Sequence, residues 1–281
     1  MQAAQSEKGR LTGERPQQGV TPDSLLALHD AGYQSILARL GEGKVLDLGC
    51  GEGFETAGLV SEERVVLGVD YSPEAAGATR GRFAGAGVVV ACMDAARLGI
   101  APRSFDWVCS SHIIEHFVDP DSHVAEMARV LKSTGSAFVL TPNAPADFEN
   151  PFHVHLFRRD DLRLALEEHF ASVWVGGLDA VPRVKEDLAA RRAKAARVLA
   201  IDFLDLRHRI PRNWYTTIYT HMLPLAYRFL ARSDSGGSTG ICAEDFFVTD
   251  QVDDTTPVLF AVATEPRERG TSATTRAARG R

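Results

Sequence analysis

Short apolar runs alternate with helix-like stretches along most of the chain. Seven runs read as strands, at residues 44–49, 65–70, 88–93, 105–110, 136–141, 172–176 and 257–263. Helical spacing of apolar positions recurs between them, at residues 22–39, 55–61, 73–83, 121–132 and 159–169. Strands that alternate with helices are typical of a parallel sheet with helices on both faces. The pattern therefore predicts an α/β fold.

The first strand-like run breaks into a glycine-rich turn at Gly49, Gly51 and Gly53. A side chain at Gly49 or Gly51 would keep a ligand away from the backbone, and Gly53 lets a helix start close to the strand. Asp47 lies just before the turn inside an apolar run, where a carboxylate could bind an ammonium group. Asp70 ends the next run, 21 residues after Gly49. An acidic residue at that place reaches ribose hydroxyls in a βαβ nucleotide site.

The turn resembles the first motif of the class I S-adenosylmethionine (SAM) methyltransferases, an acidic residue, one residue, and then Gly-x-Gly-x-Gly. Dinucleotide oxidoreductases space the third glycine one residue later, where this chain has Phe54. Further motifs similar to the ubiquinone/menaquinone-type branch follow in order along the chain. They are Cys92–Asp94, Phe105–Ser111, Ile113–His116 and Leu131–Gly135.

Two more segments are similar to methyltransferases of surface-polysaccharide and sugar modification. The first is Gly13–Pro16 followed by His29 and Tyr33, and the second is the loop Asn150–Phe157. That branch has a basic residue and then Glu where this chain has His155 and Leu156. The resemblance therefore leaves the methyl acceptor open.

The resemblance implies a Rossmann-like sheet of seven strands in the order 3-2-1-4-5-7-6. Strand 7 is antiparallel, and a helical insertion lies between strands 6 and 7. It also implies SAM as the cofactor. The cofactor-binding positions that it implies are Asp47, Gly49, Gly51, Gly53, Asp70, Tyr71, Met93, Asp94 and Ser110.

Length and composition narrow the classes of protein. The chain has 281 residues, a net charge of −6 and 44% apolar residues, which suits one soluble domain at 21–265. We expect a flexible segment at 1–20 and a disordered tail at 266–281. No apolar run approaches the ~20 residues that cross a bilayer, and the four cysteines form no CxxC pair, which favours reduced thiols and a cytoplasmic protein. The acidic charge, and the lack of an Asn-Pro-Pro-Tyr motif, argue against nucleic acid as a partner.

Histidines are the candidates for catalysis, because a hydroxyl acceptor must lose a proton during methyl transfer. His116 follows the fourth strand, at the edge of the sheet where open α/β sheets bind ligands. His153 and His155 alternate in the loop after the fifth strand, so only one of them is expected to face the site. A structural role stays open for each. We expect no metal, because no third ligand stands near His153 and His155 in the sequence.

The insertion at 182–232 is expected to act as a lid or acceptor-binding cap. It holds eleven Lys or Arg against four Asp or Glu, a net charge of +7. This charge indicates either an anionic partner or a solvated basic face. An apolar face recurs at helical spacing from Trp214 to Phe229. It would pack on the chain's own sheet or on a second copy, or else meet a lipid-linked acceptor or a membrane surface.

Together these features predict a SAM-dependent methyltransferase that O-methylates a sugar or another small hydroxylated metabolite. Methylation of a quinone, polyketide or lipid-like acceptor is the alternative among enzymes. A SAM-binding partner protein without catalysis is the alternative outside enzymes. A nicotinamide oxidoreductase is disfavoured by Phe54 and by the lack of a second nucleotide-binding half.

Overall fold

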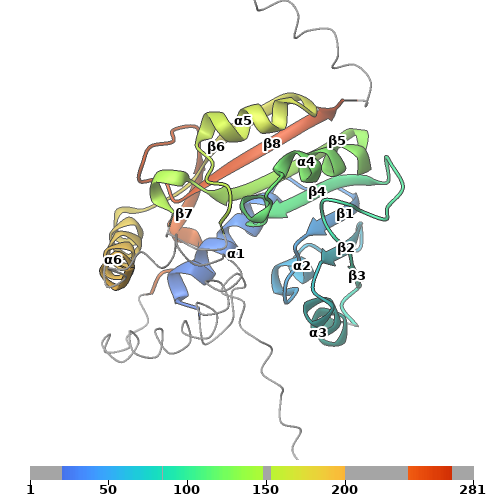
Figure 1. The fold of residues 1–281 in the computed structure, drawn as a ribbon. Helices are drawn as coiled ribbons and strands as arrows, with labels where there is room; N and C mark the ends of the chain where they lie inside the picture. Colours follow the sequence, from blue (N-terminus) through green and yellow to red (C-terminus); the bar gives the residue numbers. More distant parts are fainter. Residues whose placement is uncertain (1–20, 84, 148–152, 200–239, 268–281) are drawn as a thin grey trace, which may run out of the picture.

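The computed structural model describes residues 21–83, 85–147, 153–199 and 240–267, and they form a three-layer α/β fold around one sheet (Figure 1). The strands lie side by side in the order β3-β2-β1-β4-β5-β8-β6-β7. Their bounds are β1 Gly43–Leu48, β2 Arg64–Asp70, β3 Val88–Cys92, β4 Phe105–Ser111, β5 Leu131–Pro142, β6 Phe170–Ala180, β7 Phe246–Thr249 and β8 Val258–Pro266.

The predicted strand order and directions are confirmed, with one correction. Strands β1 to β5 pair in parallel, whereas β8 is antiparallel to both β5 and β6. The sheet has eight strands rather than the expected seven, because β7 adds an antiparallel edge strand beside β6. Only four residues long, β7 is too short to show an alternating pattern that a sequence reading would detect. The fifth strand is also longer than expected, since it takes in residues 131–135.

Helices cover both faces of the sheet, and each face has its own hydrophobic core. On one face α4 (Pro120–Val130) and α5 (Arg159–Glu167) pack with Leu46 and Leu48 of β1. On the other face α1 (Asp23–Leu37) and α6 (Pro182–Leu199) pack with Val45. A strand buried on both faces needs apolar residues at successive positions, which explains the continuous apolar runs in the sequence.

The remaining helices line the edge of the sheet that carries β2 and β3. Helix α2 (Phe54–Gly58) follows the glycine turn, and α3 (Pro73–Phe83) packs on β2 and β3. Short 3-10 turns are η1 (Ile114–His116) after β4, η2 (Ala144–Ala146) after β5 and η3 (Ala243–Asp245) directly before β7. Within the described ranges, no helix has the length and apolar character that crossing a membrane would require.

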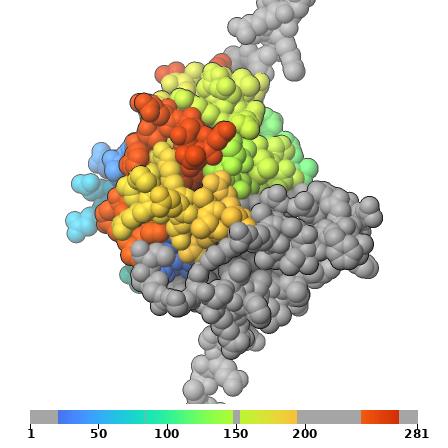
Figure 2. Space-filling view, turned by 90° about the vertical axis from the view of Figure 1, so that its left-hand side faces the viewer, coloured from blue at the N-terminus to red at the C-terminus, as the bar shows by residue number. Residues whose placement is uncertain are grey.

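Helix α6 is the described part of the predicted insertion. It lies beside residues 240–267 (Figure 2) and is tied to them by an ion pair and a hydrogen bond. Arg183 binds Asp245 at 2.6 Å, and Lys185 donates to the hydroxyl of Thr255 at 3.0 Å. The expected apolar face from Trp214 to Phe229, five of the eleven basic residues of the insertion and the two chain ends lie outside the described residues.

The carboxyl ends of β1, β2 and β4 meet at one edge of the sheet. Leu48 of β1 stands opposite both Val69 of β2 and Ser110 of β4. The chain runs outward from β1 to β2 and β3 on one side and returns to β4 and β5 on the other. In open α/β sheets, the crevice at such a reversal binds the ligand.

Candidate active site

The glycine turn between β1 and α2 forms one wall of the site. Gly49, Gly51 and Gly53 have φ angles of 77°, 52° and 79°, a region that other residues rarely adopt. A Cβ atom on Gly49 would lie 2.3 Å from the side chain of Ile113, and one on Gly53 would lie 2.2 Å from that of Thr79. A Cβ atom on Gly51 would have open space around it in the described structure, since its nearest neighbour would be the carbonyl oxygen of Gly49 at 3.9 Å. Gly49 thus allows close packing with the loop after β4, and Gly53 allows close packing with α3. At Gly51 no side chain covers the backbone.

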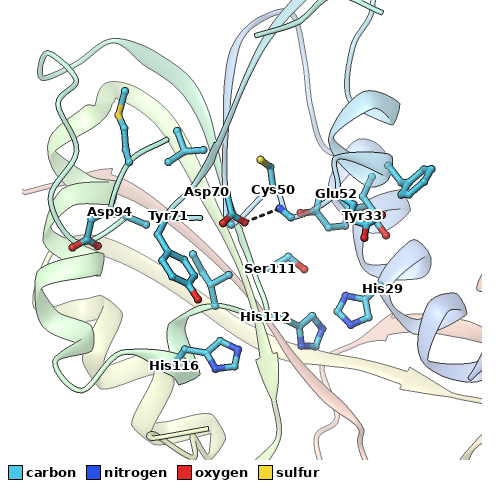
Figure 3. Close-up of a pocket in the computed structure, with 18 of the residues that line it drawn as sticks. His29, Tyr33, Cys50, Glu52, Asp70, Tyr71, Asp94, Ser111, His112 and His116 are labelled. Carbon is cyan, nitrogen blue, oxygen red and sulfur yellow. Dashed lines mark hydrogen bonds between the residues drawn. The ribbon is translucent and has the colours of Figure 1, made fainter. Parts of the chain in front are cut away.

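Asp70 is fixed against this turn. Its Oδ2 accepts a hydrogen bond from the backbone N–H of Gly51 at 3.0 Å (Figure 3), and its Oδ1 accepts one from the backbone N–H of Ser72 at 2.9 Å. The residue is only 4% exposed. Asp70 is therefore held in a fixed position against the glycine turn.

A cavity of about 310 Å³ opens between these residues and the ends of β3 and β4 (Figure 3). This volume is at the lower end of the roughly 300–1,000 Å³ typical of small-molecule sites. The predicted site residues that line it are Gly49, Gly51, Asp70, Tyr71, Met93, Asp94 and His116. Asp94 is exposed, and its Oδ1 accepts a hydrogen bond from the N–H of Ala96 at 2.9 Å. Four further lining residues, none of them among the expected site residues, are His29, Tyr33, Ser111 and His112.

Asp47 and Ser110 lie behind the cavity wall rather than on it. Asp47 is fully buried, and it accepts hydrogen bonds from the hydroxyls of Tyr33 at 3.0 Å and Thr56 at 2.5 Å. It thereby ties α1 and α2 to β1. The hydroxyl of Ser110 bonds to Nε2 of His123 at 2.9 Å, and Nδ1 of His123 bonds to the carbonyl of Ala95 at 3.1 Å. Ser110 is thus linked to the segment that carries Asp94. The expected ammonium contact of Asp47 has no direct path to the cavity in this arrangement.

Burial raises the pKa of Asp47 to about 7, although the hydrogen bonds from Thr56 and Tyr33 act to lower it. A carboxyl whose pKa is higher in the folded state binds more protons folded than unfolded. Its contribution to stability is therefore full below its ordinary pKa of 3.8 and is lost as the pH rises through about 7. The ligand-free protein should lose on the order of 4 kcal/mol of unfolding free energy from this group between those limits.

We expect the stability of the wild type, relative to an Asp47→Asn variant, to fall as the pH rises from 5 to 8, because the amide does not titrate. Thermal unfolding followed by circular dichroism at several pH values, without ligand, measures this difference. Glu62→Gln, at an exposed carboxyl away from the cavity, is the matched control and should follow the wild type throughout. Parallel curves for Asp47→Asn and the wild type would show that Asp47 does not titrate in this range.

Four histidines surround one buried carboxylate beside the cavity. Glu115 is 1% exposed, and its Oε2 accepts a hydrogen bond from the hydroxyl of Thr141 at 3.0 Å. Burial would raise the pKa of Glu115, but its interaction with the nearby ring of His112 and the charges of His116 and His153 lower it to about 2. The fourth, His29, packs on His112 with 4.4 Å between the ring centroids. Glu115 is therefore an ionised carboxylate at neutral pH.

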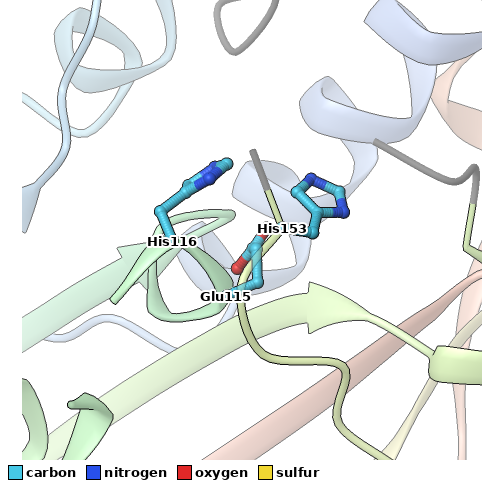
Figure 4. A group of neighbouring side chains, drawn as sticks. All are labelled: Glu115, His116 and His153. Atoms are coloured by element: carbon cyan, nitrogen blue, oxygen red, sulfur yellow. The ribbon is translucent and has the colours of Figure 1, made fainter. Parts of the chain in front are cut away.

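The structure brings His153, rather than His155, next to His116 (Figure 4). The two rings lie edge to face, with 5.2 Å between their centroids. Nδ1 of His153 bonds to the carboxylate of Asp147 at 2.8 Å. Nδ1 of His155 instead bonds to the backbone carbonyl of Phe117 at 3.0 Å. One histidine of the alternating pair thus joins the cluster and the other supports the loop.

His112 was not among the expected site residues, although it lines the cavity. Its φ angle is 56°, unusual for a residue other than glycine. Its Nδ1 lies 3.6 Å from Oε1 of Glu115, and its buried Nε2 has no hydrogen-bond partner among the described residues. Burial first, and then the charge of His112, keep the pKa of His29 well below its usual value, so that ring is neutral. His29 had a sequence signal, since it belongs to the N-terminal resemblance, whereas His112 had none.

Residues 46–139 match the family described as Methyltransferase domain. A probable S-adenosylmethionine-dependent methyltransferase of Mycobacterium tuberculosis is 33% identical over 189 residues, which cover 64% of this chain and 68% of that relative. The chain belongs to the SAM-dependent methyltransferases. The methyltransferase also resembles a ubiquinone biosynthesis O-methyltransferase of Sinorhizobium fredii, at 34% identity over 36% of this chain and 41% of that one.

Solved structures of low sequence identity share the fold. A possible histamine N-methyltransferase of Thermotoga maritima superposes with a TM-score of 0.54 and 16% identity, covering 85% of this chain and 90% of that one. A phosphoethanolamine N-methyltransferase of Haemonchus contortus, solved with SAM, gives a TM-score of 0.53 and 20% identity over 84% of this chain and 52% of that one. The Rossmann-like methyltransferase fold predicted from the sequence is confirmed.

SAM is the cofactor of the methyltransferase, and the cavity suits it. Asp70 presents a fixed carboxylate suited to the ribose hydroxyls, and the bare backbone at Gly51 admits a ligand close to the chain. Tyr71 offers an aromatic face at the cavity, and Met93 and Asp94, directly after β3, line the same cavity. Ser111 carries a buried hydroxyl with no hydrogen-bond partner in the described structure. Such a buried group needs a partner, and a polar ligand in the cavity can supply one.

Proposed function

We propose that the methyltransferase transfers the methyl group of SAM to a hydroxyl oxygen of a sugar or another small hydroxylated metabolite. The observation that carries this proposal is the cluster of histidines around ionised Glu115, beside the SAM cavity. His29, His112 and His116 face the cavity together (Figure 3). Nitrogen acceptors with a free lone pair need no proton removed before attack, whereas a hydroxyl acceptor benefits from a base. The cluster suits the second kind of acceptor.

His112 is the residue best placed to take the proton of the acceptor. SAM supplies an electrophilic methyl group, and its sulfur leaves as a neutral thioether. As the acceptor oxygen attacks, its proton passes to the buried Nε2 of His112, while Glu115 near Nδ1 stabilises the imidazolium that forms. His116 and His153, the bases predicted from the sequence, lie together beside Glu115 and would help to hold the acceptor. Holding it in line with the methyl group supplies much of the rate.

Polar atoms at the cavity support a polyhydroxylated acceptor. The hydroxyl of Ser111 and Nε2 of His112 are buried without hydrogen-bond partners in the described parts of the chain. An unsatisfied buried polar group costs about 1–3 kcal/mol, so an acceptor with several hydroxyls gains by pairing with them. A quinone-like ring with an apolar tail offers fewer such groups. It is the second candidate, since the names of the Sinorhizobium relatives point to ubiquinone biosynthesis.

The partners predicted from the sequence remain predictions. An anionic or lipid-linked acceptor would use the basic insertion, but in the described part of α6 three of its cations already pair with carboxylates. Arg183, Lys185 and Arg191 bind Asp245, Asp179 and Asp187. An anionic partner, a membrane surface or a second copy of the chain would therefore have to meet other residues of the insertion.

Methyl-transfer assays with two acceptor panels test the proposal. Purified protein and SAM are incubated with sugars and nucleotide sugars, or with catechols and quinols. Mass spectrometry then detects the methylated product together with S-adenosylhomocysteine. We expect turnover on the sugar panel, and lower turnover in a matched Asp70→Ala control at a SAM concentration that does not saturate the variant. Methylation confined to the phenolic panel contradicts the sugar assignment, and SAM binding without turnover on either panel contradicts O-methylation of both classes.

A further inference from the structure

Three side chains from two distant segments converge beside the cavity (Figure 4). Glu115 and His116 belong to η1, and His153 comes from the loop after β5. Each offers one ligand atom, and these atoms all lie within 4.8 Å of one another. We propose that Glu115, His116 and His153 bind a divalent transition-metal ion. This deepens the proposed function, on which its role rests, because the ion would hold the acceptor's hydroxyl oxygens.

The donor set fits such an ion. Two imidazole nitrogens and one carboxylate oxygen are ligands that Zn²⁺ and its neighbours in the first transition row accept readily. Metal–ligand distances of about 2.0–2.2 Å place neighbouring ligand atoms roughly 3–4 Å apart. The three ligand atoms need only small side-chain movements to reach that spacing from their present one. Three protein ligands leave coordination positions open for an acceptor or water.

The surroundings of the three residues suit metal ligands. Nδ1 of His153 bonds to the carboxylate of Asp147 at 2.8 Å, which fixes the orientation of the ring beside Glu115 and His116. A carboxylate behind a ligating imidazole fixes the ring and raises its basicity. Thr141 fixes Oε2 of Glu115, while Oε1 is buried, makes no hydrogen bond within the described ranges and has Nδ1 of His112 as a neighbour at 3.6 Å. A buried carboxylate oxygen without a partner is costly, and a cation is the partner that removes this cost most fully.

The position of the cluster gives the ion a role. His116 is both a member of the cluster and a wall residue of the SAM cavity. An ion there could take two neighbouring hydroxyls of an acceptor and lower the pKa of the one that attacks, which reduces how strong a base His112 has to be. The sequence reading expected no metal because it sought a third ligand beside His153 and His155. The structure instead pairs His153 with residues 37 and 38 positions earlier in the chain.

Metal titration of the full chain, without an affinity tag, SAM or acceptor, tests the proposal. The protein is stripped with a chelator and titrated with Zn²⁺ by calorimetry and with Co²⁺ by visible absorption. We expect one ion per chain and the d–d bands of Co²⁺ in a protein site. Glu115→Gln and His153→Ala should each weaken binding at least about tenfold. His155→Ala, a histidine of the same segment that lies outside the cluster, should bind as the wild type does.

The absence of saturable binding overturns the proposal, as does binding that neither Glu115→Gln nor His153→Ala weakens. Circular dichroism and SAM affinity report whether each variant is folded, because neither residue lines the cofactor cavity. If Glu115→Gln does not fold, His153→Ala decides the outcome. The titration uses no acceptor, so a lack of turnover on the sugar panel does not contradict metal binding. A lack of metal binding likewise does not contradict O-methylation with His112 as the base.

Discussion

Asp70→Ala should lower the affinity of the methyltransferase for SAM at least about tenfold. Each hydrogen bond from a ribose hydroxyl to a charged acceptor contributes about 1.5–3 kcal/mol, and the two bonds are not additive. The substitution also releases the backbone N–H of Gly51, which Asp70 holds at 3.0 Å, so the glycine turn loses its fixed position. Isothermal titration calorimetry with SAM measures the effect directly.

Two comparisons make this result specific to Asp70. Asp94→Ala should weaken SAM binding less, because Asp94 is exposed and would meet only the adenine edge. Glu62→Gln removes an exposed carboxyl away from the cavity and should leave the affinity unchanged. A folded Asp70→Ala variant that binds SAM as tightly as the wild type would remove Asp70 from the ribose site.

The fold could be predicted from the sequence because its strands are buried on both faces. Val45 and Leu46 of β1 face opposite cores, so the strand reads as one continuous apolar run. The edge strand β7 could not be found in this way. It has only four residues, and Phe247 in it is 48% exposed, so neither length nor apolar pattern distinguishes it from a loop.

The cofactor wall was accessible to sequence reasoning where it depends on local spacing. Gly49, Gly51 and Asp70 line the cavity as expected, whereas Gly53 faces Thr79 of α3 and does not line it. The choice of Ser110 was off by one position. Successive side chains of a strand point to opposite faces, so at the end of β4 Ser111 reaches the cavity while Ser110 turns to His123.

The acceptor side of the site could not be predicted, because long-range contacts build it. Glu115 meets Thr141 from β5 and His153 from the loop beyond it. Tyr33 reaches Asp47 from a helix outside the βαβ unit, which takes this carboxylate away from the role expected for it. The positive φ angle of His112 depends on the packing of the loop after β4, and no residue pattern in the sequence indicates it.

His112→Asn should reduce turnover by about 10²–10⁴ at saturating SAM, once an acceptor from the productive panel is in hand. The loss comes from removing the group that takes the acceptor's proton, and it should appear in kcat. Asparagine is the informative replacement, because it tolerates the left-handed backbone that His112 adopts at a φ of 56°. A β-branched residue would disfavour this backbone conformation, so a lower kcat could come either from loss of the base or from movement of the loop. Steady-state kinetics with calorimetric SAM affinity separates the two effects.

Three further histidine variants decide whether the proton acceptor is His112. His155→Ala is the matched control, because His155 supports the loop through Phe117 and does not line the cavity, so its kcat should stay near that of the wild type. His116→Ala and His153→Ala should also lose turnover if these residues hold the acceptor. Wild-type kcat in His112→Asn, together with a large loss in one of those two variants, would assign the base to that residue. Wild-type kcat in His112→Asn, His116→Ala and His153→Ala alike would mean that proximity of the acceptor to SAM is sufficient for the reaction.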